Sequence, residues 1–222
     1  MTTQIVDTIE SETSAVNLTL YSVPRSRSFA ALWLLEELGE DYRLESFDIA
    51  STRHKKTDYL ALNPMGKVPL VVDGDTPISE LGAIAIYLSD RYPHAKLSPS
   101  VEDPQRAAYL RWTFFSSAIM EPAFSQRMFQ WEAPAQSVAW GSFDQMLEIV
   151  TDAISESIWL LGDRFSSADI LVGSNLSVGQ MLGIIPTEGP IEDYISRLKK
   201  RDGFVRAQAI EVRESDRFPA QR

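Results

Sequence analysis

The step from Val68 to Pro69 constrains the fold of this chain more than any other feature, because it stands where an apolar strand begins. Proline cannot donate to a sheet ladder, so it occurs at an edge strand, at a bulge or at the first residue of a strand. X-Pro bonds are also the ones that adopt the cis form at low cost. A strand opened by Pro69 presents the amide and carbonyl of Val68 to whatever lies beside it. A trans proline on an edge strand is the alternative explanation.

An acidic residue, Glu80, stands at the start of a second apolar run that continues through Leu88. Such a run predicts a helix, and free N–H groups and the helix dipole favour anions at a helix start. Together with the strand start at Val68, this predicts half of a site for a small peptide-like ligand. The alternative is that Glu80 only complements the helix dipole.

The composition is typical of a soluble globular protein, since 44% of the 222 residues are hydrophobic and 23% are charged. No segment approaches the roughly eighteen uninterrupted apolar residues of a membrane span. The formal net charge of −10 argues against a general nucleic-acid binder, which needs a basic surface. Residues 1–15 lack the basic and apolar segments of a secretory signal. The sequence therefore predicts a cytoplasmic protein with no membrane or nucleic-acid partner.

The absence of cysteine narrows the possible chemistry further. It excludes disulfide scaffolds, cysteine-based zinc sites and a thiol nucleophile supplied by the protein. Because the chain has only two histidines, His54 and His94, we expect no metal centre. Any sulfur chemistry has to use a sulfur atom of the ligand.

The first half of the chain has the pattern of a mixed sheet covered by helices. A β-prone segment, a helix ended by Gly39 and a second strand predict a parallel β-α-β unit. After a loop at residues 49–67, a turn at Asp73-Gly74-Asp75 predicts a hairpin, which a helix follows. The expected strands are 18–21, 42–48, 68–72 and 76–79, and the expected helices are 29–38 and 80–91.

The second half contains only helix signals. Ser166 and Asp169 form a capping-box pattern before a nearly apolar helix that we expect to be central. The expected helices are 103–120, 143–160, 168–181, 191–201 and 203–212. We predict a flexible leader at 1–16, an α/β domain at 17–92, a linker at 93–102, a helical-bundle domain at 103–213 and a tail at 214–222.

Three motifs in this order resemble the cytosolic glutathione transferase family, in particular its bacterial-type, serine-type and theta-like members. They are Asn63-Pro64-Met65-Gly66-Lys67-Val68-Pro69, Glu80 before Ala83–Leu88, and Phe165-Ser166-Ser167-Ala168-Asp169. The resemblance covers residues 18–210. It implies a thioredoxin-like N-terminal domain that binds glutathione as co-substrate, a helical domain that shapes an electrophile pocket, and a homodimer.

The resemblance also implies roles for particular residues. Val68, beside cis-Pro69, would exchange main-chain hydrogen bonds with the cysteinyl unit of glutathione. Glu80 would pair with the γ-glutamyl ammonium group, and His54 and Lys67 would hold the glycine carboxylate. The basic run 53–56 that contains His54 is equally explained as a solvated loop.

A serine near the start of the first helix is the expected activator of the glutathione thiol. A helix start and nearby cations lower a thiol pKa, and a donated hydrogen bond favours the thiolate. We predict Ser26 for this role, flanked by the cations Arg25 and Arg27, with Ser28 and Ser22 as alternatives and with Arg25 also as a glutathione ligand. Ser26 and Ser28 are also explained as helix N-caps.

One residue departs from the family pattern. Leu81 stands where family members usually have a serine that holds the γ-glutamyl carboxylate. Losing one charge-assisted hydrogen bond costs about 1.5–3 kcal/mol, which weakens glutathione binding about ten- to a hundredfold. The leading prediction is a detoxifying transferase that attacks a hydrophobic electrophile with the glutathione thiolate. The alternatives are a non-catalytic binding or assembly protein and glutathione-dependent peroxide reduction.

Overall fold

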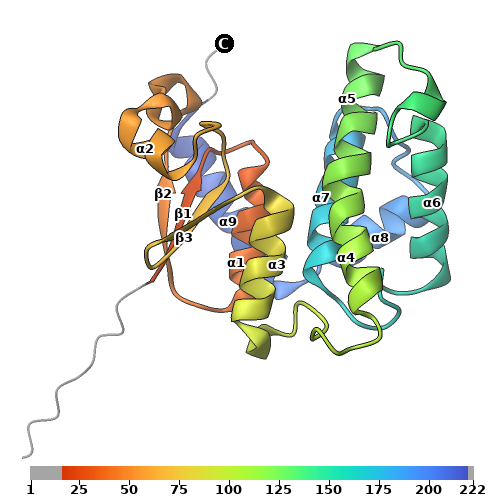
Figure 1. Cartoon of the computed structure of the whole chain (residues 1–222), viewed down its shortest axis with the longest axis horizontal. Coiled ribbons are helices and arrows are strands. Elements are labelled where there is room, and N and C mark those ends of the chain that lie inside the picture. The colour runs from red at the N-terminus through yellow and green to blue at the C-terminus, as the bar shows by residue number, and fades with distance from the viewer. Residues whose placement is uncertain (1–16, 220–222) are drawn as a thin grey trace, which may run out of the picture.

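The computed structural model describes residues 17–219, which form a mixed sheet with helices on its faces and a set of helices beside it (Figure 1). The sheet has four strands in the order β2-β1-β3-β4. They are β1 (Leu18–Ser22), β2 (Tyr42–Ser46), β3 (Leu70–Asp73) and β4 (Thr76–Ser79). β1 pairs in parallel with β2 and antiparallel with β3, and β3 pairs antiparallel with β4. This confirms the predicted sheet and the fold class of an α/β unit followed by helices.

Helix α1 (Ser28–Leu38) and helix α3 (Leu81–Arg91) form as the sequence predicts. Gly39 ends α1 in the left-handed conformation, with φ of 77°, and its N–H donates to the carbonyl of Leu35. A residue with a Cβ is strained in this conformation, so glycine is favoured at such a helix end.

The segment 49–67, predicted as a loop, is largely helical. It contains two 3₁₀ turns, η1 (Ile49–Ser51) and η2 (Arg53–Lys55), and the helix α2 (Thr57–Leu62). Tyr59 is the buried residue of α2. With one buried side chain in six residues, α2 has too short an apolar pattern for a periodicity argument to detect.

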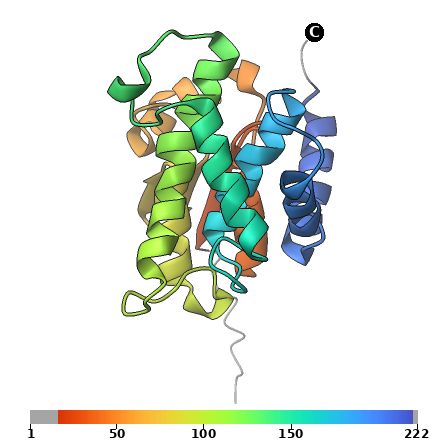
Figure 2. The ribbon, with the colours of Figure 1, turned by 90° about the vertical axis from the view of Figure 1, so that its right-hand side faces the viewer.

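The second half consists of helices joined by irregular segments (Figure 2). Its helices are α4 (Arg106–Phe115), α5 (Glu121–Phe129), α6 (Phe143–Glu156), α7 (Ser167–Met181), α8 (Pro190–Leu198) and α9 (Asp202–Arg217), with 3₁₀ turns η3 (Pro93–Ala95) and η5 (Ala135–Ser137). A π-helical stretch, η4 (Ser116–Met120), joins α4 to α5. The predicted helix end at Met120 is therefore wrong. A proline usually ends a helix. Here Pro122 lies in the first turn of α5, a position that tolerates proline, so helical structure continues past Met120.

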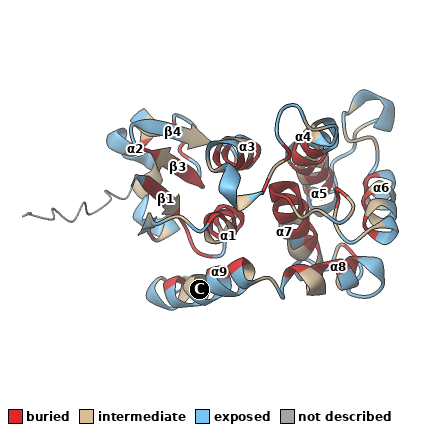
Figure 3. Ribbon diagram, turned by 90° about the horizontal axis from the view of Figure 1, so that it is seen from below, coloured by how far each residue is buried: buried red, intermediate tan, exposed pale blue. Residues whose placement is uncertain are grey.

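The last helix returns to the first half of the chain. α9 packs against α1, and Figure 3 shows the two side by side. Arg201 donates to both carboxylate oxygens of Glu37 on α1 at 2.7 Å. α9 continues to Arg217, so residues 214–217, predicted as part of a tail, are helical. The leader at 1–16 lies outside the described residues, and the division at 93–102 stays a prediction.

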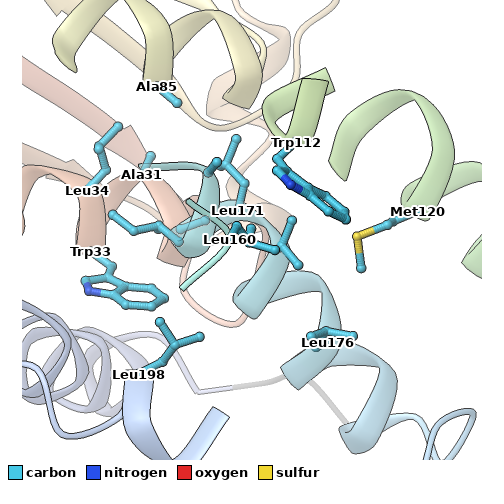
Figure 4. Packing of buried hydrophobic residues seen from close by; sticks show 14 of the residues in the cluster. Ala31, Trp33, Leu34, Ala85, Trp112, Met120, Leu160, Leu171, Leu176 and Leu198 are labelled. Carbon is cyan, nitrogen blue, oxygen red and sulfur yellow. The ribbon is translucent and has the colours of Figure 1, made fainter. Parts of the chain in front are cut away.

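The largest cluster of buried side chains surrounds α7, as predicted (Figure 4). Leu171 and Leu176 of α7 lie among Trp33 of α1 and Trp112 of α4. Ser166 and Asp169 form the expected capping box at the start of α7. Within residues 17–219, no helix is both long enough and apolar enough to cross a membrane.

Candidate active site

A cavity of about 950 Å³ lies where the turn before β3, the start of α3 and the segment from α4 to α5 meet. We call it the α3 cavity. Five of the predicted site residues line it, namely Lys67, Val68, Pro69, Glu80 and Leu81. Residues far apart in sequence complete the wall, including Arg27, Phe114, Ser117 and Glu121. The structure therefore brings together the two motifs that the sequence singled out.

The main chain before β3 is anchored by α2. The Tyr59 hydroxyl and the Asn63 side-chain amide both donate to the carbonyl of Lys67, at 2.6 Å and 2.9 Å. Burial raises the pKa of Tyr59 to about 12, so its hydroxyl keeps the donated proton. The Val68–Pro69 bond is cis, as the resemblance implies. Pairing of β3 with β1 begins at Leu70, so Val68 precedes the ladder and faces the α3 cavity.

The start of α3 forms the opposite wall of this cavity. Glu80 precedes the helix with φ of 68°, a conformation that is strained for a non-glycine residue and that is enriched at functional sites. The first residues of α3, Leu81, Gly82 and Ala83, also line the cavity. Amides of a first helical turn have no partner within the helix and favour anions. A carboxylate and a set of amide donors thus face the same space, which suits a ligand that carries both an ammonium group and a carboxylate.

Two predicted ligands lie away from this cavity. His54, in η2, stacks on Phe47 with ring centroids 6.3 Å apart, and burial lowers the pKa of its imidazole. Arg25 contacts the end of α9: its N–H donates to Glu211, and its guanidinium donates to the carbonyls of Ser215 and Phe218. Their roles as glutathione ligands stay predictions.

Two of the three candidate serines, Ser26 and Ser28, form a local network at the start of α1. The Ser26 hydroxyl has the Val23 carbonyl at 2.6 Å and Ser28 Oγ at 3.0 Å as acceptors. Ser26 Oγ also accepts from the Ser28 amide at 3.1 Å. Ser28 and Ser22 are buried. The N-cap of α1 is Arg27, and no side chain caps this helix, so neither serine is its N-cap. Ser26 Oγ nevertheless accepts from the amide of the first helical residue.

A second, smaller cavity of about 220 Å³ lies between α1, α7 and α9. We call it the α7 cavity. Its walls are mainly apolar and aromatic, with Phe29, Trp33, Val178, Met181 and Phe204 among them. Arg27 and Leu81 line both cavities, so the two spaces meet at these side chains.

Comparison with known proteins identifies this arrangement. The family model described as the glutathione S-transferase N-terminal domain matches residues 16–90. The chain is 30% identical over 154 residues to glutathione S-transferase GstA of Escherichia coli O157:H7, covering 68% of this chain and 76% of that protein. The chain belongs to the glutathione transferase family.

Two further proteins are similar to this chain. The disulfide-bond oxidoreductase YfcG of Escherichia coli strain K12 is 29% identical over 164 residues, covering 68% of this chain and 75% of that protein. A glutathione transferase homolog from Sulfitobacter, crystallised with bound glutathione, is 25% identical with a TM-score of 0.71, covering 88% of this chain and 99% of that one. The family and fold that the motifs predicted are thereby confirmed.

Two residues that line the α3 cavity were missed by the sequence reasoning. Glu121 was not considered at all, and Arg27 was noted only as a neighbouring charge. Their side chains pair across the α3 cavity, with Arg27 Nε 3.0 Å from Glu121 Oε2. The alternation of arginine and serine at 25–28 was the available signal for Arg27, whereas no local pattern marks Glu121. Within residues 17–219, no group of three or more acidic or histidine side chains could hold a metal ion.

Proposed function

We propose that this chain binds glutathione in the α3 cavity and catalyses attack of its thiolate on a hydrophobic electrophile. The observation that carries the proposal is the convergence of Val68, Glu80 and the first amides of α3 on one cavity. That cavity adjoins the apolar α7 cavity. A tripeptide and an apolar second substrate can therefore lie next to each other.

The polar groups of the α3 cavity complement glutathione along its length. Val68 supplies main-chain hydrogen bonds to the cysteinyl unit, and Glu80 pairs with the γ-glutamyl ammonium group. The amides at the start of α3 donate to the γ-glutamyl carboxylate. Lys67 lies at the other end, where it pairs with the glycine carboxylate, and we keep His54 as a second ligand there.

The α7 cavity is the proposed place for the electrophile. Aromatic side chains, among them Phe29, Trp33 and Phe204, line it and favour an apolar or aromatic group. Its volume of about 220 Å³ is small, since ligand pockets usually measure about 300–1,000 Å³. A compact electrophile, or one that extends into the α3 cavity, fits this space.

Calorimetric titration with glutathione, followed by an assay with an aromatic halide, tests the proposal. We expect binding and conjugation in the wild type. We expect Glu80→Gln to bind glutathione about ten- to a hundredfold more weakly, because it loses a charged hydrogen bond worth about 1.5–3 kcal/mol. Glu45→Gln, an exposed glutamate on β2, is the matched control and should bind as the wild type does. An absence of heat at millimolar glutathione would favour the non-catalytic alternative.

Glutathione-dependent disulfide or peroxide reduction is the second candidate function. The relation to a disulfide-bond oxidoreductase favours it, and the lack of cysteine means that both sulfur atoms would come from the ligands. Disulfide exchange with two molecules of glutathione needs no further oxidant or reductant. One glutathione thiolate attacks the substrate disulfide and releases a thiol, and a second glutathione resolves the mixed disulfide to give oxidised glutathione. Faster turnover of a model disulfide than of any aromatic halide would favour this function over the first.

We also propose that the protein is a homodimer that works in the cytoplasm. Support for the dimer comes from the family and from Phe114 on α4, whose exposed fraction is 58%. Sedimentation equilibrium tests it: a molar mass that stays at the 24.9 kDa of one chain at all concentrations would contradict the dimer.

A further inference from the structure

The position of the reacting sulfur is limited by where the two cavities meet. If glutathione occupies the α3 cavity and the electrophile occupies the α7 cavity, the thiol has to lie at their junction. Arg27 and Leu81 are the two residues that line both spaces. The leucine side chain has no hydrogen-bond donor. Arg27 is therefore the polar side chain at the place where a thiolate would have to be stabilised.

The serine predicted for this role has its proton engaged elsewhere. Ser26 carries one O–H, and the Val23 carbonyl at 2.6 Å accepts it. Its oxygen meanwhile accepts from the Ser28 amide. Donation to a ligand sulfur would break the bond to Val23, whose carbonyl is part of the turn that starts α1. Ser26 also lines the α7 cavity but not the α3 cavity.

The Arg27 guanidinium contacts Glu121 through one edge. Its Nε lies 3.0 Å from Glu121 Oε2, and the side chain of Arg27 is 62% exposed while that of Glu121 is 27% exposed. A guanidinium carries five N–H donors in a rigid fork, so contact through Nε leaves the Nη groups on the other edge. Glu121 directly follows the π-helical stretch Ser116–Met120, and π turns occur frequently at functional sites.

The charged side chains around Arg27 and Glu121 affect the ionisation of Glu121. The other charged residues that line the α3 cavity are Lys67, Glu80, Asp90 and Arg91. Burial raises the pKa of Glu121, nearby Arg27 opposes the rise, and nearby Glu80 adds to it. Arg27 thus helps to keep an otherwise unfavourable carboxylate ionised, and the carboxylate in turn fixes the guanidinium.

We propose that Arg27 is a catalytic residue whose guanidinium donates to the sulfur of bound glutathione and stabilises its thiolate, and that Glu121 is a positioning residue that holds it at the cavity junction. This inference rests on the proposed function and moves the role predicted for Ser26 to Arg27. The S–H proton leaves to solvent. The sulfur electron pair then forms the C–S bond, and the leaving group departs with the electrons of the bond that breaks.

The test measures the pKa of the bound thiol from the ultraviolet absorbance of the thiolate as the pH is varied. A free thiol has a pKa of about 8.5, and a nearby cation lowers it to about 3.5–7.5. We expect Arg27→Gln to return this pKa toward the free value and Arg27→Lys to keep part of the shift. Arg43→Gln is the matched control, because Arg43 on β2 has similar exposure and also pairs with a glutamate but lines neither cavity.

Two further variants separate the alternatives. Ser26→Ala should leave the bound thiol pKa in place, whereas a shift as large as that of Arg27→Gln would assign the role to the serine. Glu121→Gln should raise the thiol pKa part of the way, because the guanidinium is released. A lower thiol pKa in Glu121→Gln would mean that the Glu121 carboxylate weakens the effect of the Arg27 charge on the thiolate. That result would overturn the positioning role of Glu121.

Binding of S-methylglutathione, which has no ionisable thiol, separates this inference from the proposed function. We expect Arg27→Gln to bind S-methylglutathione within about threefold of the wild type while its kcat/KM at neutral pH falls at least about tenfold, the factor for one pKa unit. A wild type that binds neither ligand refutes the proposed function and this inference together. A wild type that binds both, with an unchanged thiol pKa in Arg27→Gln, refutes only the assignment of Arg27.

Discussion

The carboxylate of Asp169 is the acceptor on which the start of α7 depends, and its removal gives a quantitative test of the fold. The residue is fully buried. One oxygen accepts from the Leu160 amide at 2.9 Å and from the Tyr194 hydroxyl at 2.8 Å. The other accepts from the Ser166 amide at 2.9 Å and from the Ser166 hydroxyl at 3.0 Å. The capping box, the turn before α7 and the helix α8 therefore share one group.

The variant Asp169→Asn keeps the volume and removes one acceptor oxygen. Whichever oxygen becomes the amide nitrogen, two buried donors then face a donor instead of an acceptor. Leaving a buried donor unsatisfied costs about 1–3 kcal/mol, so the two together reduce the free energy of unfolding by about 2–6 kcal/mol. Tyr194→Phe removes a single donor to the charged group and should reduce it by about 1.5–3 kcal/mol.

Urea unfolding followed by tryptophan fluorescence measures both variants. The midpoint should fall while the m-value stays constant, because the surface exposed on unfolding does not change. Asp152→Asn, an exposed aspartate on α6, is the matched control and should stay within about 0.5 kcal/mol of the wild type. If Asp169→Asn does not fold, Tyr194→Phe provides the measurement. A wild-type midpoint in Tyr194→Phe would refute the reasoning.

Three further predictions concern the α3 cavity and its surroundings. Leu81→Ser should bind glutathione about ten- to a hundredfold more tightly by calorimetry, since a hydroxyl at the start of α3 adds a charge-assisted hydrogen bond; equal or weaker binding would contradict this. Gly66→Ala should lower the unfolding midpoint more than Gly74→Ala. Both glycines have positive φ, but a Cβ at Gly66 would lie 2.8 Å from a backbone carbonyl of η2, whereas a Cβ at Gly74 would meet nothing within 4 Å. Equal midpoints would be inconsistent with that contact. The Arg106 guanidinium lowers the pKa of Asp90 below its ordinary 3.8, so the stability from this pair is present at neutral pH and is lost as the pH falls below about 4. Asp90→Asn should therefore lose less stability than the wild type between about pH 5 and pH 3 in urea unfolding, and identical acid profiles would contradict the role of the pair.

The parts of the fold that the sequence predicts well are those with a local signal. The hairpin depends on a turn at Gly74, where φ is 59°. The start of α7 depends on Ser166 and Asp169, which lie three residues apart at the N-terminus of the helix. Each signal is confined to a few residues. The helix α2 was missed because it buries one residue, and the helix end at Met120 was wrong because a π turn lets Pro122 enter α5. A π turn has no sequence pattern that a single chain reveals.

In the candidate site, too, the residues with a local sequence signal were predictable and the others were not. The main chain at Val68 and the start of α3 were predictable because a proline and an acidic residue mark these backbone positions in the sequence itself. The side chains opposite them were not predictable, because Arg27 and Glu121 come from distant segments and meet only when the helices pack. Tertiary packing, rather than local propensity, creates this pair.

This division also explains why the departure at Leu81 does not by itself remove the site. The proposed glutathione site consists largely of main-chain groups, and these persist whatever side chain stands at position 81, so we expect the site to tolerate the change. Leu81 instead joins the apolar wall of the α7 cavity while it also lines the α3 cavity. Under the proposed function, the serine hydroxyl that the family resemblance implies is exchanged here for apolar surface in the α7 cavity. We therefore expect recognition of the tripeptide to depend more heavily on Glu80, and we expect the electrophile to gain a larger apolar wall.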